Sequence, residues 1–188
     1  MLKTLLEKFT TDKVTLTLNK AGTLQSLNPP ETRFGFTYHS HCVPPFRPEH
    51  TLILGYGKGN IAELMRRVWG QVKVTGVDNL EQAREYNEYS IVTKDAYNFV
   101  RECADSKVKT RFDYIVLDLF DLESNEHPDF MFDASFAMRI REICVKMLCI
   151  NVFTKDVPRL RAYYDYGFKF IRNDNVYGNS VIFWEIKK

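Results

Sequence analysis

The sequence lacks the features that would place a chain in a membrane or an oxidising compartment. Its four cysteines form no CxxC pair, and we expect reduced thiols and a cytoplasmic location. No apolar run is long or uninterrupted enough to span a bilayer. The first residues, MLKTLLEKF, contain no small-residue cleavage site, so we expect no signal peptide.

An excess of one charge is also missing. The 26 Lys and Arg against 24 Asp and Glu give a formal net charge of +2, which does not indicate a nucleic-acid partner. Hydrophobic residues make up 45% of the chain and charged residues 27%, as in soluble globular proteins. A chain of 188 residues is long enough to bury a full core.

Proline is infrequent, and most of it gathers in a collar around residues 28–50. This collar divides the chain into an N-terminal arm, residues 1–50, and a main domain, residues 51–188. In the arm, the stretch KVTLTLNKAGTLQSL reads as two short alternating runs around Gly22, which predicts a β-hairpin.

From residue 51 onward, strand and helix patterns alternate. Five strand–helix alternations predict an α/β fold: a doubly wound, mostly parallel, seven-stranded sheet with helices on both faces. Predicted helices include residues 60–70, 80–88, 134–147 and 157–167. The last two strands, 168–174 and 179–186, are too close in sequence for a parallel crossover, so they should form an antiparallel hairpin.

Glycine is scarce, with nine in all, yet three follow the first strand at alternate positions: Gly55, Gly57 and Gly59. Such a turn lets a ligand approach the backbone and supplies N–H groups near a helix N-terminus. The dinucleotide fingerprint GxGxxG would need glycine where Asn60 stands, so a nicotinamide or flavin cofactor is disfavoured.

Acids end the next three predicted strands, at Asp78, Asp95 and Asp118. The carboxyl ends of parallel strands meet at one edge of a sheet, so these acids should converge on the glycine turn. Asp78, 23 residues after Gly55, is placed to accept hydrogen bonds from a ribose diol. Asp95 can accept from the exocyclic amine of a base, or cap the following helix, or do both.

These motifs resemble the class I S-adenosylmethionine-dependent methyltransferases, and within them the spermidine synthase branch. KVTGVD is similar to the family's ribose-binding strand, TKDAYNFV to its adenine-binding segment, and FDYIVLDLFD to its Y-D-V-I-x-x-D-x-x-D motif. Upstream, GTLQS and FTYHSH resemble the L-Q and Y-[HQ]-E elements, which adds His39 to the matched positions. The resemblance implies a Rossmann-like fold.

The resemblance also implies the roles of individual residues. The catalytic set would be Asp118, Asp121 and Tyr38, with the first Asp handling an amine nucleophile. Residues that would bind S-adenosylmethionine, or its decarboxylated form, are Gln25, Gly55, Gly57, Lys58, Gly59, Asp78, Asn79, Asp95, Ala96 and Asp118.

The chain departs from the polyamine synthases at several positions. Lys58 stands where they have Asp, and Ser40 where they have Glu. The loop DLFDLESNEH lacks their Pro and Gly, and VYGNS is a poor match to their later T-Y-P-S-G. A lysine facing the ligand would favour the carboxylated cofactor, since its charge attracts a carboxylate; alternatively, its amine extends into solvent.

Three functions remain open at this point. The leading hypothesis is an S-adenosylmethionine-dependent transferase that methylates an amine or another small cation, such as a polyamine-like molecule. The alternatives are an aminopropyltransferase that uses decarboxylated S-adenosylmethionine and a cofactor-binding protein without catalysis. We expect a small-molecule substrate, no metal site, no membrane association and a possible homodimer.

Overall fold

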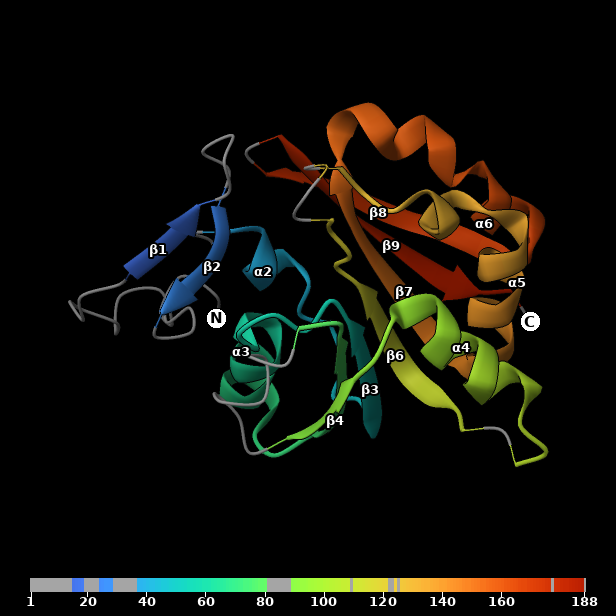
Figure 1. Ribbon diagram of the computed structural model, residues 1–188, viewed down its shortest axis with the longest axis horizontal. Helices are drawn as coiled ribbons and strands as arrows, with labels where there is room; N and C mark the ends of the chain where they lie inside the picture. Colours follow the sequence, from blue (N-terminus) through green and yellow to red (C-terminus); the bar gives the residue numbers. More distant parts are fainter. Residues whose placement is uncertain are drawn as a thin grey trace.

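In the computed structural model, strands and helices alternate from His50 onward (Figure 1). The structure describes residues 15–18, 24–28, 37–80, 89–108, 110–121, 124, 126–176 and 178–187. The strands are β1 (Thr15–Leu18), β2 (Leu24–Asn28), β3 (His50–Leu54), β4 (Lys73–Asp78), β5 (Ser90–Thr93), β6 (Phe112–Leu117), β7 (Cys144–Phe153), β8 (Phe168–Val176) and β9 (Asn179–Ile186). The helices are α2 (Tyr38–His41), α3 (Asn60–Trp69), α4 (Ala96–Asp105), α5 (Ala134–Ile143) and α6 (Arg161–Asp165), with 3-10 turns η2 (Asp129–Phe132) and η3 (Thr154–Leu160).

Seven strands form one sheet in the order β5-β4-β3-β6-β7-β9-β8. Pairing is parallel from β5 to β7, whereas β9 runs antiparallel to both β7 and β8. The strand order reverses between β3 and β6, which is where ligands bind in doubly wound sheets. The predicted fold and both predicted hairpins are confirmed, since β1 and β2 also pair antiparallel. The division at residue 50 stays a prediction.

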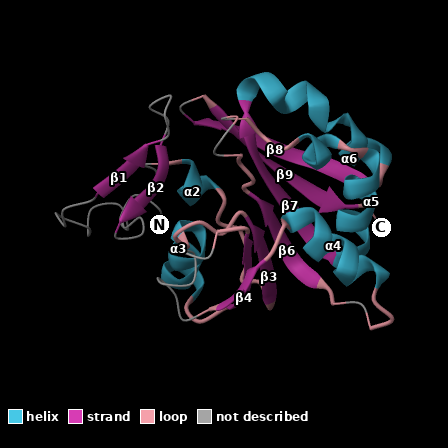
Figure 2. Cartoon of the chain, in the orientation of Figure 1, coloured by secondary structure: helices cyan, strands magenta, loops and turns pink. Residues whose placement is uncertain are grey.

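Buried side chains cover both faces of the sheet. Along β3, Leu52 and Leu54 belong to one hydrophobic cluster and Ile53 to another, as alternation along a strand requires. Residues of α4 and α5 pack in the first cluster, and residues of α3 in the second. Figure 2 shows α4, α5 and α6 on one side of the sheet and α2 and α3 on the other.

The structure corrects three boundaries. The helix predicted to reach residue 147 ends at Ile143, and β7 already begins at Cys144. The helix predicted over 157–167 starts as the 3-10 turn η3, which contains Pro158, and becomes α-helical only at Arg161, since 3-10 turns are frequent at the start of α-helices. Strand β8 continues to Val176, further than expected. The helix predicted over 80–88 falls almost entirely outside the described residues.

The backbone segments that follow β3 and β6 approach each other closely at the switch point. The Asp118 amide donates to the Leu54 carbonyl at 2.9 Å, which continues the pairing beyond β6. A Cβ atom at Gly55 would overlap the Asp118 carbonyl, and Gly55 has a φ of +81°. Only glycine fits at this position.

Two glycine substitutions test this constraint. We expect Gly55→Ala to lower the free energy of unfolding by about 3 kcal/mol or more, since it adds a backbone clash to a strained φ. Gly57→Ala is the matched control: its φ is +54°, but a Cβ there meets no atom within 4 Å. It should cost only about 1–2 kcal/mol. Urea unfolding measures both, and equal losses in the two variants would contradict the close approach.

Candidate active site at the carboxyl ends of the strands

The glycine turn lies directly after β3 and leads into α3. The amides of Gly55 and Tyr56 donate to the Val77 carbonyl at 2.9 and 3.1 Å, which holds the turn against the end of β4. Gly57 and Gly59 have φ values of +54° and +79°, and Gly59 is the N-cap of α3. The turn therefore presents backbone beside a helix N-terminus, as the sequence predicts.

Asp78, the last residue of β4, contacts this turn directly. Its Oδ2 accepts a hydrogen bond from the Gly57 amide at 2.7 Å, and its Oδ1 accepts from the Leu80 amide at 2.9 Å. A carboxylate has about four lone-pair sites, so each oxygen retains capacity for another donor. The carboxylate thus organises the turn and could still accept from a ligand diol. Asn79 follows in the exposed turn.

Asp95 lies near the end of the neighbouring strand, β5. It is the N-cap of α4, where its Oδ1 accepts from the Asn98 amide at 2.9 Å. The Lys94 amide donates to the Asp78 carbonyl at 2.9 Å, which joins this loop to β4. Ala96 is buried at the first position of α4. The capping role of Asp95 is confirmed, and contact with adenine stays a prediction for Asp95 and Ala96.

Asp118, directly after β6, accepts hydrogen bonds from two side chains at the switch point. The Asn151 Nδ2 atom donates to its Oδ1 at 2.8 Å, and the Tyr38 hydroxyl donates to its Oδ2 at 3.3 Å. The structure thereby joins Tyr38 and Asp118, which are 80 residues apart in sequence. The two residues are therefore in contact, and their catalytic role stays a prediction.

The surroundings of Asp118 change its acidity. Burial raises the pKa of Asp118 above its ordinary value of 3.8. The nearby His39, together with the hydrogen bonds from Asn151 and Tyr38, opposes this rise without cancelling it. A carboxylate whose pKa is raised is a better proton acceptor than an exposed one, which suits a general base.

Asn151, near the end of β7, was missed by the sequence reasoning. It is only 4% exposed, and its Oδ1 atom is buried without a hydrogen-bond partner. An unpaired buried acceptor costs free energy, which an N–H donor would relieve. The one available signal was a polar residue within the apolar strand LCINVFT. Its meaning depends on the pairing of Leu117 with Ile150, which puts the following residues Asp118 and Asn151 side by side.

Helix α2 carries Tyr38 to the site. Its His39 is 3% exposed, and the ring contacts Thr37 Oγ1 at 2.8 Å and Asn60 Nδ2 at 3.4 Å. These contacts join α2 to the first residue of α3. The Tyr114 hydroxyl also donates to the Cys42 carbonyl just after α2. Tyr38 is therefore held from both the sheet and α3.

Other predicted residues are less closely tied to Asp118. Asp121 is exposed and forms hydrogen bonds within its own loop, where its Oδ1 accepts from Ser124. Lys58 is partly buried in the glycine turn. Gln25 lies in β2, and its side chain is outside the described part of the structure.

The part of the chain that the structure describes has neither a cluster of metal ligands nor a membrane-spanning helix. Within those ranges, no three His, Cys, Asp or Glu side chains gather as metal ligands would. None of the helices described above is long and apolar enough to cross a membrane.

Comparison with known proteins identifies the fold. Human methyltransferase-like protein 13, solved with S-adenosylhomocysteine, aligns with a TM-score of 0.65 at 14% identity over 74% of this chain and 72% of its own. Spermidine synthase with the transition-state analogue AdoDATO aligns with a TM-score of 0.64 at 15% identity over 89% of this chain and 64% of its own. Magnesium protoporphyrin IX methyltransferase from Synechocystis, with bound S-adenosylmethionine, aligns with a TM-score of 0.51 at 14% identity over 73% of this chain and 69% of its own.

No protein-family model matches the chain, and no curated protein sequence matches it significantly. At such low identity, the structural matches show the fold alone. That fold is the class I methyltransferase fold, as the sequence motifs predict.

The raised pKa of Asp118 predicts how stability depends on pH. The folded protein holds the Asp118 proton more tightly than the unfolded chain does. Ionisation of Asp118 therefore lowers stability as the pH rises from the unfolded pKa through the folded one. Asp118→Asn removes this charge at similar shape, so it should be more stable than wild type near neutral pH.

Urea unfolding across a pH series checks this prediction. The stability difference between Asp118→Asn and wild type should shrink as the pH falls toward about 4, the ordinary pKa of an aspartate. Asp165→Asn, at an exposed position in α6, is the control and should show no such trend. A difference that does not change with pH would contradict the raised pKa.

Proposed function

We propose that this protein is an S-adenosylmethionine-dependent transferase that acts on an amine or another small cationic acceptor. The observation that carries the proposal is the meeting of a glycine turn, Asp78 and Asp118 at the switch point of a class I methyltransferase fold. The turn adjoins the helix N-terminus and Asp78, and Asp118 lies behind Gly55 with two hydrogen-bond donors on its carboxylate.

The residues present fit an adenosyl-sulfur cofactor. A Cβ at Gly57 would meet no atom within 4 Å, so there is space in front of the turn. Asp78 would hold the ribose diol, and Asp95 with Ala96 would face the adenine. When bound, S-adenosylmethionine supplies an electrophilic carbon on its sulfonium. That solved structures of this fold contain S-adenosylmethionine or S-adenosylhomocysteine supports the same choice.

The chain's own residues would prepare the acceptor. The Asp118 carboxylate attracts a cationic amine, orients its nitrogen and receives the proton that the nitrogen loses. Tyr38 steadies Oδ2, and Asn151 steadies Oδ1. The buried Asn151 Oδ1 could accept a second N–H from the acceptor. Asp121 adds negative potential at the exposed end of the site.

The transferred group is assigned from Lys58. Its positive charge favours the carboxylate of S-adenosylmethionine and therefore methyl transfer. The similarity to spermidine synthase supports a second candidate, aminopropyl transfer from the decarboxylated cofactor. A third candidate, cofactor binding without catalysis, is favoured by the loop after Asp121, whose segment LESNEHPDFMFD has no glycine hinge.

Asp78→Ala tests the cofactor site. Loss of its charged hydrogen bonds should weaken binding of S-adenosylhomocysteine by about 1–3 kcal/mol in calorimetry. Asp165→Ala is the matched control at an exposed site in α6 and should bind as wild type does. Unchanged affinity in Asp78→Ala, with the fold intact by circular dichroism, would remove Asp78 from the site.

Lys58→Asp tests the choice between the two cofactors. We measure the ratio of the dissociation constants for S-adenosylmethionine and its decarboxylated form. Wild type should prefer the carboxylated form, and the variant should narrow or invert this preference by about 1–3 kcal/mol. The effect should shrink with added salt, and Lys169→Asp on exposed β8 should leave the ratio unchanged. A wild-type preference for the decarboxylated form would move aminopropyl transfer to first place.

A further inference from the structure

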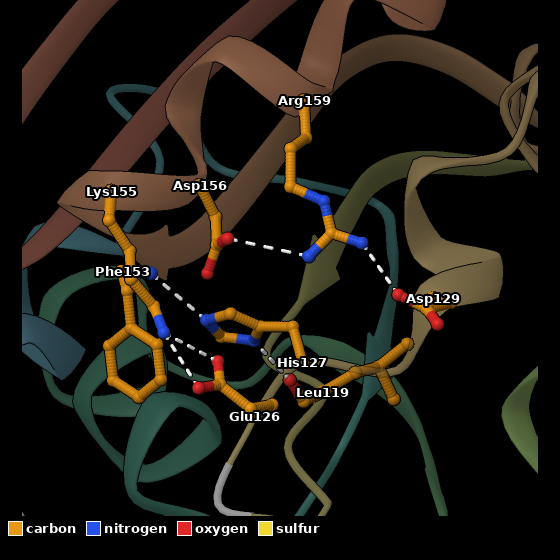
Figure 3. A network of polar contacts seen from close by, with 8 residues as sticks. All are labelled: Leu119, Glu126, His127, Asp129, Phe153, Lys155, Asp156 and Arg159. Carbon is orange, nitrogen blue, oxygen red and sulfur yellow. Dashed lines mark hydrogen bonds and ion pairs between the residues drawn. The ribbon is translucent and has the colours of Figure 1, made fainter.

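The loop that follows Asp118 is fastened by one buried histidine. His127 is 6% exposed, and its Nδ1 lies 2.7 Å from the Leu119 carbonyl oxygen. Its Nε2 lies 2.9 Å from the Phe153 amide nitrogen. Figure 3 shows the imidazole between these two backbone groups, one in the loop after β6 and the other at the end of β7.

These two contacts define the protonation state of His127. A backbone amide can only donate, so Nε2 must carry a lone pair to accept from Phe153. A carbonyl oxygen can only accept, so Nδ1 must carry the proton that is donated to Leu119. Both hydrogen bonds therefore exist only in the neutral ring with hydrogen on Nδ1. An imidazolium, which has two N–H donors, would lose the bond to Phe153.

The groups that His127 joins are next to Asp118 and Asn151 in the sequence. Leu119 directly follows Asp118, and Phe153 lies two residues after Asn151. The Phe153 ring also packs on the imidazole, with 4.7 Å between ring centroids. The 2.8 Å hydrogen bond between Asn151 and Asp118 spans the same two strands. His127 thus fastens the backbone on both sides of that bond.

Charged groups surround this histidine from each neighbouring element. Asp118 lies on the β6 side. Two ion pairs join the loop and η2 to η3: Glu126–Lys155 at 2.7 Å and Asp129–Arg159 at 2.6 Å. Asp156 in η3 is the remaining charged group near the imidazole, and its Oδ1 lies 3.4 Å from the Arg159 Nη1.

Asp156 has an unusual feature. It is 6% exposed, and its Oδ2 is buried without a hydrogen-bond partner. Figure 3 shows its carboxylate and the Arg159 guanidinium on the same side of the imidazole. A buried carboxylate oxygen without a donor is costly, so it would readily accept a new N–H.

We propose that His127 is a positioning residue that holds Asp118 in place only while its ring is neutral. When Nε2 takes a proton, the hydrogen bond to Phe153 is lost, and the negative charge of the Asp156 carboxylate in η3 favours the imidazolium. The loop that carries Asp118 then separates from the end of β7. The effect of His127 on catalysis rests on the proposed function, but its two hydrogen bonds, to Leu119 and Phe153, do not.

Amide hydrogen exchange of Phe153, followed by NMR as a function of pH, tests the fastening without any assay of activity. In wild type, the protection of this amide should fall by about tenfold as the His127 ring takes up its proton. Ring ¹⁵N shifts report that protonation and should show Nδ1–H at higher pH. His127→Phe keeps the shape and should show low protection at every pH.

Two further variants complete the design. His50→Phe changes a partly buried histidine at the opposite end of β3 and should retain wild-type protection of Phe153. Asp156→Asn keeps His127 but removes the charge that favours its imidazolium, so loss of protection should shift to lower pH. This variant keeps the test decisive if His127→Phe does not fold.

The outcomes separate the two proposals. Phe153 protection that does not change with pH in wild type, or that is the same in His127→Phe, overturns the role of His127 whatever the enzyme does. If the fastening holds and the protein binds cofactor, His127→Phe should lower kcat and alter its pH profile while the cofactor dissociation constant stays unchanged. Equal kcat and an equal pH profile in both proteins would overturn the positioning of Asp118.

Discussion

The close approach of Gly55 to the Asp118 carbonyl is the constraint on which the rest of this site depends. It lets β3 and β6 stay paired up to Leu54 and Asp118, after which the two segments diverge. The glycine turn is thereby placed against β4, where Asp78 accepts the Gly57 amide. The same approach puts the Asp118 side chain beside the turn. One position without a side chain thus connects the region proposed for the cofactor with the region proposed for the acceptor.

The polar groups around Asp118 make the site costly to form. Burial disfavours the charged carboxylate, and only Asn151 and Tyr38 donate to it in the described structure. The Asn151 Oδ1 and the Asp156 Oδ2 are buried without partners. Such groups persist where the surrounding fold is stable enough to hold them, here the two-sided hydrophobic core. Burial of the Asp118 carboxylate lowers the stability of the folded protein, and it also raises the pKa that makes this carboxylate a better proton acceptor.

Much of this arrangement could be predicted from the sequence, because strand-end residues in a parallel sheet converge by geometry alone. That reasoning located the glycine turn, Asp78 and Asp118. It could not find Asn151, whose role depends on the register between β6 and β7, or His127, whose contacts are with backbone from two separate segments. The short 3-10 turn η3 was also read as helix, since the pattern of apolar residues does not distinguish the two.

The central claim is that the switch point binds an adenosyl-sulfur cofactor. NMR titration of the wild-type protein with S-adenosylhomocysteine tests it most directly. Saturable shifts of the Gly55 and Gly57 amides, at one ligand per chain, with the amides of α6 unaffected, are what this account predicts. No shift of those amides at high micromolar protein and ligand, or shifts confined to another face of the molecule, would contradict it.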